Sequence, residues 1–70
     1  MCLSIPGKVL SIEGDKAQVA IQGNKVEVSL QLLEEVKVDD YVLVHVGFAL
    51  ETISDEEAQE MLAVLKELKQ

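Results

Sequence analysis

Two side chains in this sequence are of types that suit metal chemistry: the thiol of Cys2 and the imidazole of His45. They are the only cysteine and the only histidine in the chain. Thiolate and imidazole are ligands that iron, zinc and copper accept. A closed structural zinc site needs about four protein ligands, so one thiol and one imidazole leave a metal coordinatively open. This donor set favours a carrier, which must both load and release its metal.

Cys2 occupies a position that favours exposure. Cysteine is usually a small buried hydrophobe, but chain termini tend to be solvated unless they are tied down. If Met1 is removed, the thiol lies beside a free α-amine and the two could chelate a metal. Pro6 restricts its own φ and disfavours helix at Ile5. The pattern therefore predicts a stiff extended arm that presents Cys2, although Pro6 could also begin a strand.

His45 belongs to an apolar segment that alternates as a strand does. A period of two predicts Tyr41, Leu43 and His45 on one face and Val42, Val44 and Val46 on the other. A lone histidine in such a strand is more often a hydrogen-bonded core residue than a ligand, although imidazole can serve in both roles. Both roles are open for His45 on the sequence alone.

Short strands followed by one helix must position these side chains. Alternation and glycine-containing turns predict strands at 8–12, 17–21, 25–30 and 41–46. Residues 48–53 fit either a short strand or an extended crossing, and 29–35 fits either more strand or a helical turn. Ser54 and Glu57 form a capping-box pattern that opens a helix from Asp55 to about Lys69. Many short strands in a small chain close into a barrel to hide their edges. The expected fold is mainly β: an OB-like barrel of about five strands with a C-terminal helix.

Length and composition predict a single domain over 1–70. It divides into an extended arm at 1–7, the barrel at 8–53 and the helix at 54–70. No signal peptide and no membrane-spanning run is visible. A single unpaired thiol suits a reducing compartment, so we expect a cytoplasmic protein.

The net charge of −7 excludes several classes of partner. Nucleic acids and anionic membranes attract basic surfaces, and this chain has no arginine at all. An oligonucleotide-binding role, which the barrel alone would suggest, is therefore disfavoured. No catalytic triad or phosphate loop can be assembled from the sequence, so we do not expect an enzyme.

Three stretches make the chain similar to the HypC/HupF family, the small chaperones of nickel–iron hydrogenase maturation. They are Met1-Cys2-Leu3-Ser4-Ile5-Pro6-Gly7-Lys8, residues 28–36, and the run from Asp40 to Ala49. The hallmarks are a cysteine with proline four residues later, and the His-Val-Gly-Phe-Ala run that starts at His45. The resemblance covers essentially the whole chain. Two positions depart from the family pattern: Ser4 replaces glycine or alanine, and Asp39 replaces glycine.

The resemblance implies an OB-like barrel with a terminal helix, and a specific function. It implies that the cargo is iron bearing cyanide and carbon monoxide. The implied partners are the iron–sulfur scaffold protein HypD and the precursor of the hydrogenase large subunit. Cys2 would bridge to iron or partner, and His45 would assist at the metal or support it. The residues expected to bind partners are Cys2, Leu3, Ile5, Pro6 and His45.

A second function class is a metal-independent interaction module, in which the acidic barrel docks on a partner and Cys2 is incidental. Exposed apolar residues would suit either class, because a docking face needs them in both. Replacement of Cys2 by alanine separates the two, since only the carrier would lose its metal.

Overall fold

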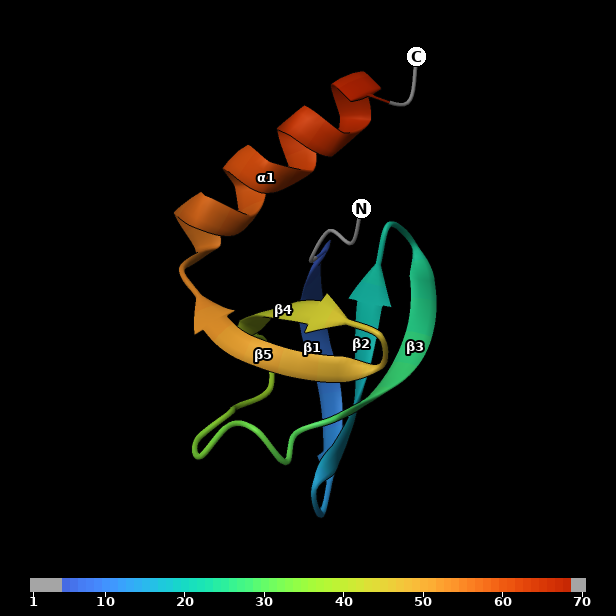
Figure 1. The fold of residues 1–70 in the computed structure, drawn as a ribbon, viewed down its shortest axis with the longest axis vertical. Coiled ribbons are helices and arrows are strands. Elements are labelled where there is room, and N and C mark those ends of the chain that lie inside the picture. Colours follow the sequence, from blue (N-terminus) through green and yellow to red (C-terminus); the bar gives the residue numbers. More distant parts are fainter. Residues whose placement is uncertain (1–4, 69–70) are drawn as a thin grey trace.

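The computed structural model describes residues 5–68, which form a closed five-stranded barrel followed by one helix (Figure 1). The elements are β1 (Ile5–Glu13), β2 (Lys16–Ile21), β3 (Asn24–Ser29), β4 (Tyr41–His45), β5 (Phe48–Ile53) and α1 (Asp55–Leu68). Around the barrel the order is β1-β2-β3-β5-β4. The predicted barrel with a C-terminal helix is confirmed.

Four of the five strand pairs are antiparallel, and the barrel is closed by the fifth, which is parallel. This closing contact between β3 and β5 consists of one register pair, Ser29 with Phe48. The backbone N–H of Ser29 also donates to the carbonyl oxygen of Gly47 at 2.9 Å. The β4–β5 hairpin is therefore held against the end of β3.

Two hairpins use the same two-residue turn. Gln22 and Gly23 join β2 to β3 with φ of 51° and 89°, and Val46 and Gly47 join β4 to β5 with φ of 53° and 81°. Two residues with positive φ form the type I′ turn, whose twist matches that of the flanking strands. Val46 was expected on the strand of residues 41–46, and this was wrong. The apolar run continues past His45, but the strand does not.

β1 starts earlier than the sequence suggested. Ile5, Pro6 and Gly7 pair with Val44, Leu43 and Val42 of β4, so these three residues belong to the barrel and not to an arm that ends at residue 7. A proline is tolerated here because it stands at the start of the strand, where one missing N–H costs little.

The core consists mainly of small β-branched side chains from the inner faces of the strands. Val9, Val19, Val28 and Val42 are among its largest fully buried side chains, and Ala49 is also fully buried. The segment between β3 and β4 is a loop, and the backbone N–H of its Leu30 donates to the Asp15 carbonyl oxygen at 2.7 Å. Asp39 in this loop has a φ of 79°, the left-handed conformation that glycine would adopt readily and aspartate tolerates.

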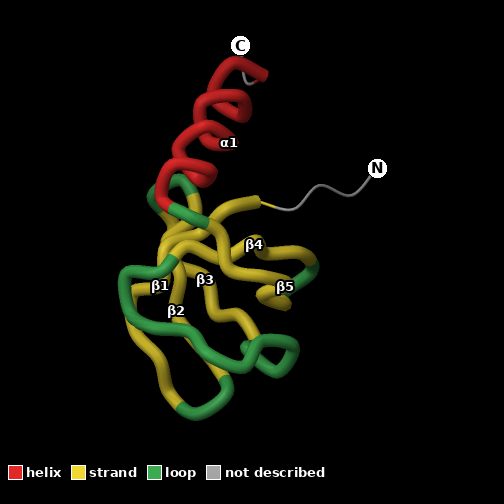
Figure 2. The backbone as a smooth tube through the Cα atoms, turned by 90° about the vertical axis from the view of Figure 1, so that its left-hand side faces the viewer, coloured by secondary structure: helices red, strands yellow, loops and turns green. Residues whose placement is uncertain are grey.

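Helix α1 begins with the expected capping box. The Glu57 N–H donates to the Ser54 hydroxyl at 3.1 Å, and the Ser54 N–H donates to the Glu57 carboxylate at 3.1 Å. The helix leaves the barrel at an angle and extends away from it (Figure 2). Ala58 is its one fully buried residue within the part of the helix whose side chains are described. In the described chain, no helix is long and apolar enough to cross a membrane.

Candidate functional site

The β1–β4 ladder brings the start of the described chain to the end of β4. Ile5 is the register partner of Val44, and His45 is the next residue and the last of β4. The sequence placed Ile5 and His45 in the same candidate site without a geometric reason. The antiparallel pairing supplies that reason.

His45 lies on the outer face of the barrel. The inner face of β4 carries Val42 and Val44, which are buried, while Tyr41, Leu43 and His45 are half-buried. The predicted division of these faces is confirmed for the residues of β4. A hydrogen-bonded core histidine does not fit, because no polar or charged side chain is buried among the residues whose side chains are described. The imidazole is therefore open to an incoming ligand or partner.

Pro6 and Gly7 belong to β1 and have structural roles in the barrel. Pro6 is fully buried, so it fixes the path of β1 and offers no surface for a partner. A Cβ on Gly7 would lie 3.0 Å from Ile21 Cγ1 and 3.3 Å from Val19 Cγ2. Glycine thus allows β1 to pass close to β2. Of the expected partner-binding residues that the structure describes, Ile5 and His45 remain half-exposed.

Cys2 and Leu3 lie outside the described residues. Among residues 5–68, no three His, Cys, Asp or Glu side chains are grouped so as to hold a metal ion.

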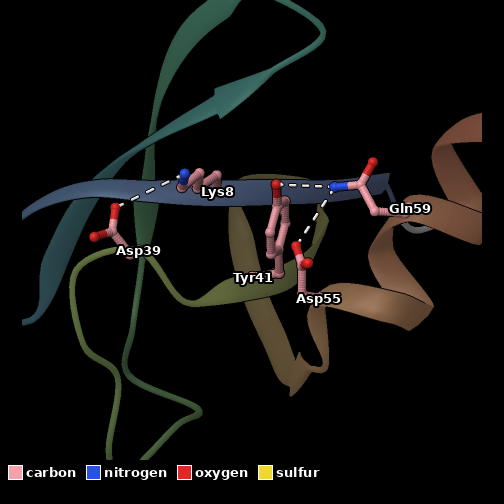
Figure 3. A network of polar contacts seen from close by, with 5 residues as sticks. All are labelled: Lys8, Asp39, Tyr41, Asp55 and Gln59. Atoms are coloured by element: carbon pink, nitrogen blue, oxygen red, sulfur yellow. Dashed lines mark hydrogen bonds and ion pairs between the residues drawn. The ribbon is translucent and has the colours of Figure 1, made fainter.

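Polar contacts on one side of the barrel link the start of β4 to its neighbours (Figure 3). The Gln59 amide nitrogen donates to the Tyr41 hydroxyl at 3.2 Å and approaches Asp55 Oδ1 at 3.5 Å. Lys8 is the register partner of Tyr41, and its Nζ lies 3.9 Å from Asp39 Oδ1. The first contact joins the strand that carries His45 to α1, and the contact between Lys8 and Asp39 joins β1 to the loop that precedes β4.

A hollow in the described surface lies at the other end of β1. It has a volume of about 350 Å³ and is lined by Ile12, Gly14, Asp15, Leu30, Gln31, Leu33, Glu34 and Val36. These residues belong to the β1–β2 turn and the loop after β3. The hollow is thus separated from His45 by the length of β1.

The hairpin tip is a surface feature that the sequence alone did not reveal. Val46 is 77% exposed and Phe48 is 41% exposed. The signal was present, since two residues containing glycine between two apolar strands are typical of a hairpin. The alternation of Val42, Val44 and Val46 concealed it, because it made Val46 look like the last residue of the strand.

Comparison with known proteins gives a consistent result. The model of the HupF/HypC family matches residues 1–65. A hydrogenase maturation factor HypC of Rhizobium leguminosarum bv. viciae is 46% identical over 68 residues, covering 96% of this chain and 91% of that protein. The corresponding factor of Azotobacter chroococcum mcd 1 is 42% identical over 71 residues, covering 100% of this chain and 84% of its own. The hydrogenase maturation factor HypC of Escherichia coli K12 is 35% identical over 74 residues, covering 97% of this chain and 82% of that protein.

Proposed function

Because this chain belongs to the HupF/HypC family, we propose that it carries the iron fragment Fe(CN)2CO during hydrogenase maturation. Family membership supports the role of a maturation chaperone and not that of an enzyme. In the proposed cycle the chain holds the fragment in a complex with the scaffold protein HypD. It then delivers the fragment to the precursor of the large subunit of nickel–iron hydrogenase. We place this cycle in the cytoplasm, whose reducing conditions keep a single thiol free.

One observation carries the proposal: the end of β4 with His45 lies beside the start of β1, the strand that continues from Cys2. His45, one of the two candidate iron ligands, therefore lies at the end of the barrel where the described part of β1 begins. A thiolate is a soft ligand for iron, and imidazole is a second ligand that iron accepts. Sequence spacing alone would not have brought Ile5 and His45 to neighbouring strand positions.

A site with a small number of protein ligands also suits a cargo that must be released. Cyanide and carbon monoxide would fill part of the iron coordination sphere, and Cys2 and His45 would fill another part. The remaining position is open to a ligand from a partner. A partner that offers a further ligand can then take over the fragment without passing through free iron.

The test is anaerobic purification of the tagged chain from cells that express the other maturation proteins. Wild type is compared with Cys2→Ala and His45→Ala, with Gln22→Ala on the β2–β3 turn as the surface control. Iron is assayed in the eluate, and infrared spectra are searched for cyanide and carbonyl bands. We expect wild type and the control to carry both, Cys2→Ala to carry neither, and His45→Ala to carry less.

The same experiment tests the alternative of a metal-independent interaction module. If Cys2→Ala matches wild type in iron, infrared bands and captured partners, the thiol is not a working residue. The chain would then act by docking alone. Loss of iron with unchanged partner capture would instead separate cargo binding from docking and favour the carrier.

A further inference from the structure

The tip of the β4–β5 hairpin presents apolar side chains to solvent. Val46 is the most exposed large apolar residue among those described, and Phe48 and Leu50 follow it on β5, at 41% and 40% exposure. We call Val46, Phe48 and Leu50 the apolar tip. The segment 41–50 contains no Asp, Glu or Lys, although the chain as a whole is strongly acidic. An uncharged, exposed apolar stretch on such a surface marks a contact site.

Val46 is also unfavourable for the turn that it forms. Its φ is 53°, and a β-branched residue in the left-handed region is an outlier that stable turns avoid. The β2–β3 hairpin has the same turn and places the polar Gln22 at the equivalent position, with a φ of 51°. Folding does not require valine there, and solubility opposes it. Strain held at an exposed position is typical of functional sites.

The apolar tip is fixed in place before any partner arrives. Gly47, within the turn, accepts the hydrogen bond from the Ser29 N–H at 2.9 Å. Phe48 pairs with His45 across the hairpin and with Ser29 across the barrel closure. A preorganised tip loses little conformational entropy on binding. It also moves together with His45, the candidate iron ligand.

We propose that the apolar tip enters an apolar recess, bordered by lysine or arginine, on the large-subunit precursor. This inference rests on the proposed function. Before it receives the iron fragment, the acceptor must have its metal site open to the outside, and a two-residue turn is the narrowest element of the barrel. Since His45 pairs with Phe48 of the tip, insertion of the tip brings the cargo site to the opening. It also shields that site from water.

The net charge of the chain favours a different protein over a second copy of this chain as the binding partner of the apolar tip. Each copy carries a net charge of −7, so two copies repel when their surfaces approach. A basic border around the recess attracts the same charge. Salt should therefore weaken the complex with the precursor.

The key variant is Val46→Asn, with Gln22→Asn as the matched control. Asparagine is favoured at this turn position in both hairpins, so both variants should unfold at a temperature equal to or above that of wild type. We expect Val46→Asn to raise the Kd for the purified precursor about tenfold, since it withdraws one apolar side chain from the interface. Gln22→Asn should leave that Kd unchanged. Binding of both variants to purified HypD should also be unchanged.

Val46→Asp tests the apolar recess, because aspartate has the shape of asparagine and adds only a charge. We expect Val46→Asp to bind the precursor more weakly than Val46→Asn, since a charge inside an apolar recess loses its hydration. A reversed order would exclude the apolar recess.

Several outcomes would overturn the proposal. If Val46→Asn binds the precursor as wild type does, the inference fails while the proposed function stands. If Val46→Asn loses HypD instead, or if Gln22→Asn weakens binding equally, the tip is not the specific contact. If light scattering shows a wild-type dimer that Val46→Asn dissociates, the tip is a contact between copies. If wild type binds no precursor at all, the inference and the delivery step both fail.

Discussion

The hydroxyl oxygen of Tyr41 accepts a hydrogen bond from the side-chain amide of Gln59 at 3.2 Å, which joins the first residue of β4 to helix α1. The neighbouring helix residue, Ala58, is fully buried. The buried Ala58 and the Gln59–Tyr41 hydrogen bond are thus two points of attachment between the helix and the barrel, and Met61, Leu62 and Leu65 are half-buried farther along it. The helix is otherwise directed away from the strands (Figure 2).

Tyr41→Phe should loosen this attachment without unfolding the barrel. The lost hydrogen bond is solvent-accessible, so we expect a cost of about 0.5 kcal/mol. Hydrogen exchange should become faster in α1 and stay unchanged in β1 and β2. Gln31→Leu is the control, because it removes the exposed Gln31–Asp15 hydrogen bond at a distance from the helix. Unchanged exchange in α1 would show that the helix is held by other contacts.

Ser54→Ala should destabilise the start of α1. The Ser54 side chain accepts from the Glu57 N–H, and Glu57 bonds back to the Ser54 N–H. Loss of such a cap costs about 1 kcal/mol, to be measured as a drop in helical circular dichroism and faster exchange of the first helical amides. Because the two residues act as a pair, Ser54→Ala combined with Glu57→Ala should cost less than the sum of the single changes. Additive costs would contradict a reciprocal cap.

Gly7→Ala should destabilise the barrel by overpacking. The new methyl group would lie 3.0 Å from Ile21 Cγ1, closer than carbon atoms pack, and such insertions cost about 1–3 kcal/mol. Urea unfolding measures the change. In an Ile21→Ala background the same glycine change should cost less, because the obstructing carbon is gone. An equal cost in both backgrounds would place the clash elsewhere.

His45→Gln should leave the fold stable while reducing bound iron. The imidazole is on the outer, half-exposed face of β4, so its replacement removes no core contact. Val44→Ala, on the buried inner face of the same strand, is the contrasting variant. It should lower the free energy of unfolding by about 2 kcal/mol. Thermal unfolding and iron content are measured on both. A loss of stability for His45→Gln that equals that of Val44→Ala would make His45 a structural residue.

Most of the local structure could be predicted because it depends on neighbours in the chain. Alternation along residues 17–21 and 25–30 predicted two strands, and Ser54 with Glu57 predicted the helix start. The differences lie at both strands that meet at the candidate site. Pro6 was predicted either to stiffen an arm or to begin a strand, and the structure shows it near the start of β1, paired with β4. Val46 was assigned to a strand by its side chain, although its backbone forms the turn.

The sequence by itself determined the chemistry: one thiol, one imidazole, no arginine, a net charge of −7, and the residue pattern of the family. It also determined the local elements, because the period of apolar residues is a property of adjacent positions. Only the tertiary structure decided that Ile5 pairs with Val44, that β3 and β5 close the barrel, and that Val46 is left in solvent. These relationships join positions distant in the chain. They arise because the apolar inner faces of all five strands can be buried together only when the sheet closes on itself.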